Sequence, residues 1–205
     1  MPSKMKLHWS PKSPYVRKVM ICLYELEFVD RVETIRSVAA MLKPNELIMQ
    51  DNPLSKIPTL TTSDGMVLFD SIVICEYLNT LGQGNLFPNE SINKWQALRW
   101  HALGDGLLDA LILWRNERER EHALPNLIEA FKLKFDASLE MLDTELGALS
   151  TSSFNVGTLT IGCALGYADY RFENLKWREK HPELADWYLE LCKRPSFALT
   201  APVDG

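Results

Sequence analysis

The chain has 205 residues, of which 46% are hydrophobic and 24% are charged, a balance typical of an ordinary folded protein. Its formal net charge of −5 argues against a nucleic-acid-binding surface or an anionic-membrane surface, because both need clustered positive charge. No apolar run approaches the about 20 residues that span a bilayer, and the N-terminal apolar stretch is too short for a signal peptide, so we expect neither.

The first part of the chain alternates between strand and helix patterns. Residues 5–9 predict a short strand, and Ser13-Pro14 predicts a helix start, with the serine as N-cap and the proline at the first helical position. Alternating apolar residues predict a second strand over residues 28–35, and we expect a short helix over residues 41–49.

A hairpin and a capped helix follow. Two short apolar runs, residues 59–62 and 66–69, are separated by an Asp-Gly turn, which supplies the positive φ that a tight hairpin needs. Asp70-Ser71 then caps a helix over residues 72–81. Strands that alternate with helices favour a sheet with a parallel part, and the hairpin adds an antiparallel edge.

The composition changes after a short linker at residues 82–90, and no convincing strand pattern follows. Helical patterns cover about residues 91–121, 124–146, 156–170 and 182–192. We therefore expect an α/β domain over residues 1–81 and an all-α helical bundle domain over residues 91–205. Asn155 can cap the third of these helices, but Thr158 replaces the acidic residue of the usual capping box, a departure that we expect to affect folding and not chemistry.

The four cysteines are far apart and form neither a C-x-x-C pair nor a Cys/His cluster at zinc spacing. They are Cys22, Cys75, Cys163 and Cys192. Each lies among apolar positions of a helical pattern, where a cysteine is more often a small core residue than a ligand. The sequence thus predicts no metal site, and a reducing compartment such as the cytoplasm fits best.

Ser13 is the first residue whose position suggests chemistry. It stands where a strand gives way to a helix, and the first helical turn has unpaired N–H groups and the positive end of the helix dipole. A sulfur anion placed there would be stabilised, and the Ser13 hydroxyl could donate a hydrogen bond to it, favouring thiolate over thiol. A simple N-cap is the more common interpretation of an isolated Ser-Pro, and Ser10 in the preceding turn is a rival hydroxyl that lacks the helix-start position.

The second signal is the stretch from Asn52 to Pro58. A proline directly before a strand can hold a cis bond and fix a sharp bend. Such a bend would leave the backbone N–H and C=O of Ile57 free to pair with an extended peptide as an added strand. Viewed alone, this stretch is more often an ordinary proline-containing loop.

The third signal is Asp70-Ser71 at the start of the helix after the hairpin. A second helix N-terminus here offers a hydroxyl and N–H donors to a carboxylate. The carboxylate of Asp70 could pair with an ammonium group. In isolation, the pair is more often a plain helix cap.

Together, the three signals resemble the motifs of one family. Residues 9–19 resemble the serine-type first motif of the cytosolic glutathione S-transferase superfamily, residues 52–58 its N-P-x-x-x-[IV]-P motif, and residues 70–78 its [ED]-S-x-x-I-x-x-Y-L motif. Residues 1–81 look like the thioredoxin-like domain of that superfamily, and residues 91–205 look like its helical domain. The resemblance covers essentially the whole chain.

The resemblance implies a role for each matching residue. Ser13 matches the position that faces the sulfur of glutathione. Ile57 matches the residue whose backbone pairs with the cysteinyl part, and Pro58 matches the cis-proline. Asp70 and Ser71 match the pair that grips the γ-glutamyl amine and carboxylate.

Lys56 is a weaker candidate for binding the glycyl carboxylate of glutathione.

In the related glutaredoxins the first motif reads C-P-Y-C, whereas Ser13 and Val16 occupy both cysteine positions here. Without a nucleophilic cysteine at this place, thiol–disulfide exchange by the glutaredoxin route is excluded.

The activity that the resemblance implies is conjugation of the glutathione thiolate to a small electrophile, without a covalent enzyme intermediate. Glutathione would be a co-substrate, no cofactor would be permanently bound, and the family implies a homodimer. Two other functions stay open on this scaffold. One is a different glutathione-dependent enzyme, such as an isomerase, dehalogenase or peroxidase, and the other is a non-catalytic glutathione-binding or interaction protein.

Overall fold

The computed structural model describes residues 3–89 and 91–204. The chain divides into two compact units: the first contains the residues up to Phe87 together with those from Pro195 onward, and the second runs from Pro88 to Arg194. The fold class is therefore the expected one, an α/β unit and an all-helical unit. The segment from Pro195 onward differs from the expectation, because it packs in the first unit and not in the helical one.

The first unit is built on a mixed sheet of four strands. These are β1 (Met5–Trp9), β2 (Val32–Arg36), β3 (Thr59–Thr61) and β4 (Val67–Leu68). The strand order is β2-β1-β3-β4, in which β1 and β2 are parallel while β3 is antiparallel to both of its neighbours. The predicted second strand begins later than expected, because a 3₁₀ turn, η1 (Val29–Arg31), precedes it.

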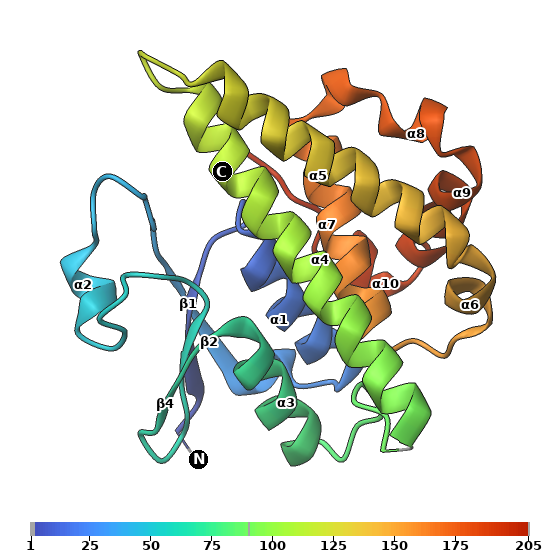
Figure 1. The fold of residues 1–205 in the computed structure, drawn as a ribbon. Helices are drawn as coiled ribbons and strands as arrows, with labels where there is room; N and C mark the ends of the chain where they lie inside the picture. The colour runs from blue at the N-terminus through green and yellow to red at the C-terminus, as the bar shows by residue number, and fades with distance from the viewer. Residues whose placement is uncertain (1–2, 90, 205) are drawn as a thin grey trace. The chain divides into compact units, whose positions relative to one another are not determined.

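Three helices connect these strands. They are α1 (Pro14–Glu25), α2 (Glu46–Met49) and α3 (Ser71–Leu81). In Figure 1, α1 and α3 lie on one side of the strands and the segment that carries α2 lies on the other. Helix α2 is shorter than predicted, since Pro44 disfavours helical backbone before it and Asn45 caps the helix by accepting a hydrogen bond from the N–H of Leu47.

The C-terminal segment, which includes the short helix α10 (Pro195–Ala198), packs against α1. The guanidinium group of Arg17 is buried, with 5% of the residue exposed, and it donates hydrogen bonds to the carbonyl of Phe197 at 3.3 Å and the hydroxyl of Thr200 at 3.5 Å. The hydroxyl of Ser196 donates to the carboxylate of Glu25 at the other end of α1. These contacts explain why the segment belongs to the first unit.

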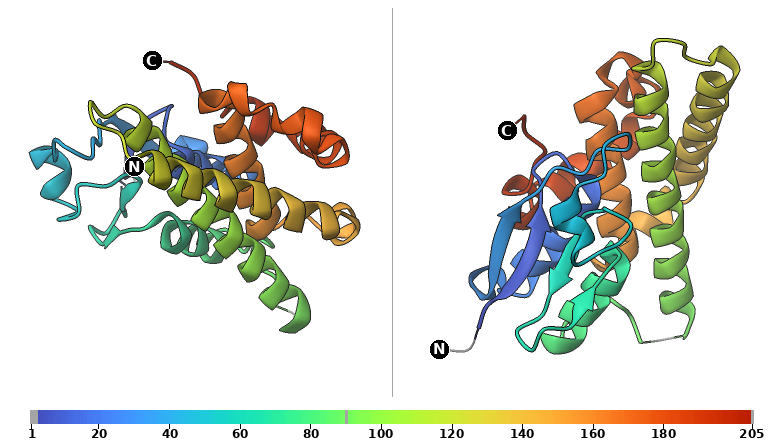
Figure 2. Two further views of the ribbon diagram at one scale, coloured as in Figure 1. Left: turned by 45° about the horizontal axis from the view of Figure 1, so that its top comes forward. Right: turned by 90° about the vertical axis from the view of Figure 1, so that its left-hand side faces the viewer.

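The second unit is all-helical. It contains α4 (Ser91–Arg118), α5 (Pro125–Thr144), α6 (Leu146–Thr151), α7 (Val156–Arg171), α8 (Trp177–Lys180) and α9 (Pro182–Cys192), with a 3₁₀ turn, η2 (Glu173–Leu175), before α8. Helix α7 packs against α4, and α4 against α5, as the right-hand view of Figure 2 shows. Every residue from 156 to 168 is buried, which identifies α7 as the core helix of this unit.

The start of α7 confirms the predicted Asn155 cap and shows that Thr158 takes part in it. The side-chain oxygen of Asn155 accepts hydrogen bonds from the N–H groups of Gly157 and Thr158 at 2.8 and 3.2 Å. In return, the hydroxyl of Thr158 accepts a hydrogen bond from the N–H of Asn155 at 3.0 Å. Thr158 thus completes a capping box without the usual acidic residue.

None of the described helices is both long and apolar enough to cross a membrane.

The close packing of α4 on α7 depends on Gly104. A Cβ atom at this position would lie 2.9 Å from the backbone atoms of Thr160 and Ile161, too close for any side chain. Gly106, two residues further along α4, has no such neighbour, because nothing lies within 4 Å of its hypothetical Cβ. Gly106 can therefore serve as the control position for a substitution at Gly104.

We expect Gly104→Ala to lower the free energy of unfolding by about 1–3 kcal/mol, because the helices must move apart to relieve the clash. Gly106→Ala should leave stability unchanged or raise it by up to about 1 kcal/mol, because alanine favours a helix more than glycine does. Urea unfolding monitored by circular dichroism measures both. Equal effects of the two substitutions would contradict this view of the α4–α7 contact.

Candidate functional site

The pairing of the strands brings three connecting segments to one end of the sheet. Strand β1 ends at Trp9, and the antiparallel strand β3 starts there, with His8 opposite Thr59. Strand β3 pairs in turn with β4, with Leu60 opposite Leu68. The turn after β1, the loop before β3 and the residues after β4 therefore lie at the same end of the sheet.

This end of the sheet carries all six residues that the sequence singled out. They are Ser13 after β1, Lys56, Ile57 and Pro58 before β3, and Asp70 and Ser71 after β4. The residues belong to three segments that are separated by tens of positions in the chain. Strand register alone is sufficient to place these segments next to one another.

Ser13 is the N-cap of α1. Its Oγ accepts a hydrogen bond from the N–H of Val16 at 3.3 Å, so the hydroxyl proton remains available to a ligand atom. The side chain is half-buried at the positive end of the helix dipole, and the first turn of α1 contains no acidic residue. An anion next to this hydroxyl would be stabilised by both the dipole and the hydrogen bond.

Ser10 has a different environment. Its Oγ accepts hydrogen bonds from a guanidinium nitrogen of Arg36 at 3.0 Å and from the N–H of Lys12 at 3.4 Å. The Ser10 hydroxyl therefore stabilises the turn between β1 and α1. Ser10 lies three residues before Ser13, the N-cap of α1. Arg36, at the end of β2, was not singled out from the sequence, and it adds a positive charge beside this turn.

Ile57 has the free backbone that the sequence predicted. The Ile57–Pro58 peptide bond is cis, as is Phe69–Asp70. Among the described residues, none forms a hydrogen bond with the backbone N–H or C=O of Ile57. The residue is only half-buried, so an extended peptide could reach both groups and pair with them as an added strand.

Asn52 shapes the loop that presents Ile57. Only 1% of this residue is exposed, and its side-chain amide donates hydrogen bonds to the carbonyl of Lys56 at 3.3 Å and the hydroxyl of Thr59 at 3.0 Å. Its carbonyl oxygen accepts a hydrogen bond from the N–H of Leu54 at 3.0 Å. Asn52 begins the motif at residues 52–58, but its structural role could not be predicted from the sequence because it depends on the folded loop.

Asp70 and Ser71 form a second helix start at this end of the sheet. Asp70 is exposed and caps α3, with one carboxylate oxygen accepting a hydrogen bond from the N–H of Ile72 at 3.2 Å. Ser71 is the first residue of α3 and is buried. Across residues 3–89 and 91–204, no ion pair involves either the carboxylate of Asp70 or the ammonium group of exposed Lys56. Both charges are available to an ionic ligand.

The arrangement suits a small peptide with charged ends. Two helix N-termini offer donors to anions, Asp70 offers a carboxylate to an amine, and the Ile57 backbone offers a strand edge. Within the part of the chain that the structure describes, no group of three or more His, Cys, Asp or Glu residues could hold a metal ion.

The cysteines lie apart from this chemistry. Cys22, Cys75 and Cys163 are buried free thiols, and Cys192 is half-buried. The side-chain hydrogen bond with Cys75 and burial in the core raise the pKa of the Cys22 thiol well above its usual range. A protonated, buried thiol is a poor nucleophile, so Cys22 does not suit this chemistry. Cys22, Cys75 and Cys163 are core residues, as the sequence predicted, whereas Cys192 is not.

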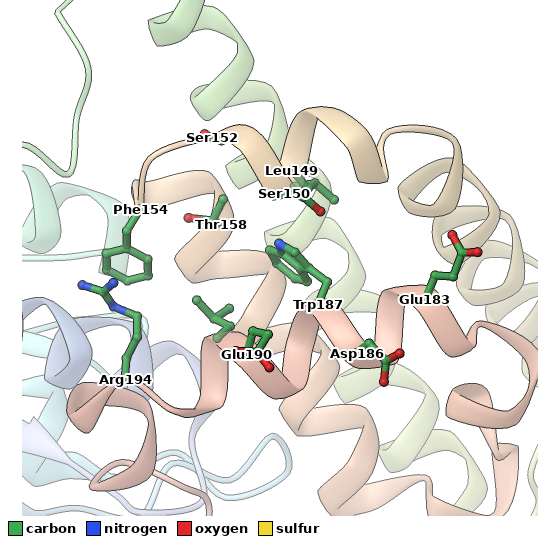
Figure 3. Close-up of a pocket in the computed structure, with 11 residues that line it drawn as sticks. Leu149, Ser150, Ser152, Phe154, Thr158, Glu183, Asp186, Trp187, Glu190 and Arg194 are labelled. Carbon is green, nitrogen blue, oxygen red and sulfur yellow. The ribbon is translucent and has the colours of Figure 1, made fainter.

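The second unit has a groove of its own, with a volume of about 500 Å³, between α6, the start of α7 and α9. Figure 3 shows Trp187 in this groove and the guanidinium of Arg194 next to the Phe154 ring. The guanidinium carbon lies 4.1 Å from the centre of that ring. Glu183, Asp186 and Glu190 line the same groove. None of the predicted site residues contributes to it, and its three carboxylates do not suit an anionic peptide.

The chain is similar to known proteins of one family. The family model described as glutathione S-transferase, N-terminal domain, matches residues 12–81, and the one described as glutathione S-transferase, C-terminal domain, matches residues 125–190. The chain is 32% identical to the uncharacterized GST-like protein YibF of Escherichia coli, over 97% of this chain and 98% of that protein. It is 30% identical to glutathione S-transferase stcT of Emericella nidulans, over 75% and 73% of the two chains.

Solved structures give the same result. A glutathione transferase family member from Pseudomonas fluorescens, crystallised with bound glutathione, superposes with a TM-score of 0.94 at 39% identity, over 98% of this chain and 100% of that chain. A glutathione S-transferase from Methylobacillus flagellatus, also with glutathione bound, superposes with a TM-score of 0.88 at 36% identity and with the same coverage.

Proposed function

Because the chain belongs to the glutathione S-transferase superfamily, we propose that it binds glutathione and activates the thiol for attack on a small electrophile. The observation that carries this proposal is the placement of Ser13, Ile57 and Asp70 at one end of the sheet, each with an unused polar group. The glutathione found in the two solved relatives supports the same ligand for this chain.

Glutathione would be held by its backbone and its two charged ends. The cysteinyl part pairs with the N–H and C=O of Ile57 as a short added strand. The γ-glutamyl amine pairs with the carboxylate of Asp70, and the γ-glutamyl carboxylate takes the N-terminal donors of α3 beside Ser71. The glycyl carboxylate lies within the reach of the Lys56 ammonium group.

The sulfur would then face Ser13. A free thiol has a pKa of about 8.5, so a stabilisation of about 2.7 kcal/mol, two pKa units, makes it largely ionised at neutral pH. The helix dipole of α1 and the hydrogen bond from the Ser13 hydroxyl both favour the anion. The proton leaves to solvent, and the bound thiolate becomes the nucleophile.

Conjugation follows from this ionised state. The sulfur lone pair forms a carbon–sulfur bond with the electrophile, and a leaving group departs with its electron pair or, in an addition, the new anion takes a proton from solvent. The protein contributes orientation and charge stabilisation, and forms no covalent bond to either substrate.

The site does not favour thiol–disulfide chemistry. Ser13 and Val16 stand at the positions of the redox cysteines of glutaredoxins, and the Cys22 thiol is buried with a raised pKa. We also propose that the protein acts in the cytoplasm, where a reducing environment keeps the buried thiols of Cys22, Cys75 and Cys163 unpaired.

Asp70 allows a direct test of glutathione binding. Asp70→Ala should weaken binding by about 1.5–3 kcal/mol, the range for a hydrogen bond to a charged group. Asp70→Asn keeps an equally good N-cap for α3 and removes only the charge, so it separates the ion pair with the amine from helix capping. Isothermal titration calorimetry gives both affinities. Unchanged affinity in both variants would remove Asp70 from the binding site.

Ser13 allows a test of thiol activation. Ser13→Ala should leave glutathione affinity nearly intact, because the peptide is held elsewhere, while the pKa of the bound thiol rises toward the free value of about 8.5. Ultraviolet absorbance of the thiolate, titrated with pH, measures this change. Conjugation of an aryl halide should fall at neutral pH and partly recover at higher pH, since the helix dipole remains.

Ser10→Ala is the matched control, and it should change neither the thiol ionisation nor the rate. The opposite result, a loss with Ser10→Ala alone, would mean that Ser10 and not Ser13 faces the sulfur. If neither substitution alters ionisation and the bound thiol keeps the free pKa of about 8.5 in the wild type, the protein holds glutathione without activating it, and the non-catalytic function is correct.

We further propose that the protein is a homodimer. Each unit exposes apolar side chains that a partner copy could cover: Val73 and Leu81 on α3 in the first, and Ile92 and Trp95 on α4 in the second. We expect sedimentation equilibrium at micromolar concentration to give twice the chain mass of 23.4 kDa. Trp95→Glu should shift the mass toward the monomer, and a wild-type monomer would refute the proposal.

A further inference from the structure

His8 forms a buried cluster with two polar residues that the proposed function does not use. Only 3% of His8 is exposed, and both of its ring nitrogens have partners. Nδ1 lies 2.8 Å from the hydroxyl oxygen of Ser37, and Nε2 lies 3.0 Å from a carboxylate oxygen of Asp51. His8 is on β1, whereas Ser37 and Asp51 belong to the stretch of chain that carries α2 and covers this face of the sheet.

The two partners of His8 stand at the two ends of one segment, residues 37–51, which we name the α2 segment. It leaves the sheet after β2, carries α2 and leads directly into the loop that holds Ile57. All of this segment is described, and Ser37 and Ile48 are its only buried residues. With so little buried surface, the segment depends on its polar links to stay in place.

The number of hydrogen-bond donors in the cluster depends on whether His8 is protonated. The hydroxyl of Ser37 also lies 3.0 Å from the carbonyl of Ile35, and it has only one proton to donate. When His8 is protonated, both ring N–H groups donate, one to Ser37 and one to Asp51. The Ser37 proton then goes to Ile35, and every partner is satisfied, with an ion pair between His8 and Asp51.

The neutral form cannot make the same set of bonds. A carboxylate only accepts, so the remaining ring proton stays on Nε2 and Nδ1 becomes an acceptor. The Ser37 hydroxyl must then turn from Ile35 to His8, and the charge of the ion pair is lost. Deprotonation therefore weakens the links at both ends of the α2 segment together.

The surrounding charges do not replace this interaction. By register, Lys6 and Glu33 lie two residues along the same sheet face, and the facing residue of β3 is Thr59, which is uncharged. The chain that covers this face also carries Lys43, Glu46 and Lys56. Of the ion pairs among the described residues, the one made by His8 is with Asp51.

A hydrolytic function for this Ser-His-Asp set is excluded by burial. Ser37 is 3% exposed, so its hydroxyl cannot reach a substrate. What the cluster does touch is the ligand-binding loop, because Asp51 is followed by Asn52, the residue that fixes the Lys56 carbonyl. The N–H groups of Asp51 and Asn52 both donate to the carbonyl of Ile48 in α2, at 3.0 and 2.7 Å.

We propose that His8 is a positioning residue whose imidazolium form clamps the α2 segment and, through Asp51 and Asn52, the loop that presents Ile57 to glutathione. The inference rests on the proposed function for its ligand. Since the charged form makes the clamp, affinity for glutathione is highest at low pH and falls as His8 loses its proton.

S-methylglutathione is the probe that isolates the clamp, because it lacks the thiol that would otherwise titrate. Its dissociation constant, measured by calorimetry from about pH 5.5 to 8, should rise about fivefold or more, the lower end of typical coupling between linked sites. Asp51→Asn retains a hydrogen-bonding side chain without the charge. In this variant the dissociation constant should no longer depend on pH and should stay near the higher value that the wild type has at about pH 8. His8→Gln should do the same, while His122→Gln, at an exposed position, should leave the profile unchanged.

Hydrogen exchange of the peptides from residues 38–50 gives a second measurement that needs no ligand. After correction for intrinsic rates, protection should fall with rising pH in the wild type and not in Asp51→Asn. If the protein fails to bind S-methylglutathione but shows this change in protection, the clamp stands and the ligand is wrong. If binding occurs and neither affinity nor protection responds to pH through His8, the clamp is refuted.

Discussion

Strand β3 is the constraint on which the rest of the first unit depends. It is three residues long, yet it pairs with β1 on one side and with β4 on the other. Its antiparallel register is what carries the turn after β1, the loop before β3 and the start of α3 to the same end of the sheet. A shift of register would turn every side chain of β3 to the other face and separate Ser13 from Ile57 and Asp70.

The features that the sequence predicted are those with a local cause. Ser13 before Pro14 defines a helix start within a few residues, and the Asp-Gly turn defines the hairpin in the same way. The Asn155 cap of α7 also has a local cause in its residue type, whereas the part that Thr158 plays in the same capping box was not expected. The family motifs added the one non-local element, that these starts belong together in one site.

The features that the sequence did not predict join distant residues. His8 meets Ser37 and Asp51 across 29 and 43 positions, and Arg17 meets Phe197 across 180. No periodicity encodes such pairs, because a buried histidine or arginine in an apolar run has the same pattern whatever its partner is. The burial of Asn52 is also a consequence of how the loop closes. The short extent of α2, in contrast, has a local cause in Pro44 and the Asn45 cap, which the expected helix over residues 41–49 ignored.

The contact of the C-terminal segment with α1 also has a consequence for biosynthesis. The ribosome makes α1 early, then the whole second unit, and only then the residues that receive the Arg17 guanidinium and the Glu25 carboxylate. Helical units with local contacts can form as they emerge, whereas a unit assembled from both ends of a chain must wait for the later piece. The unit that is translated first is therefore the one that is completed last.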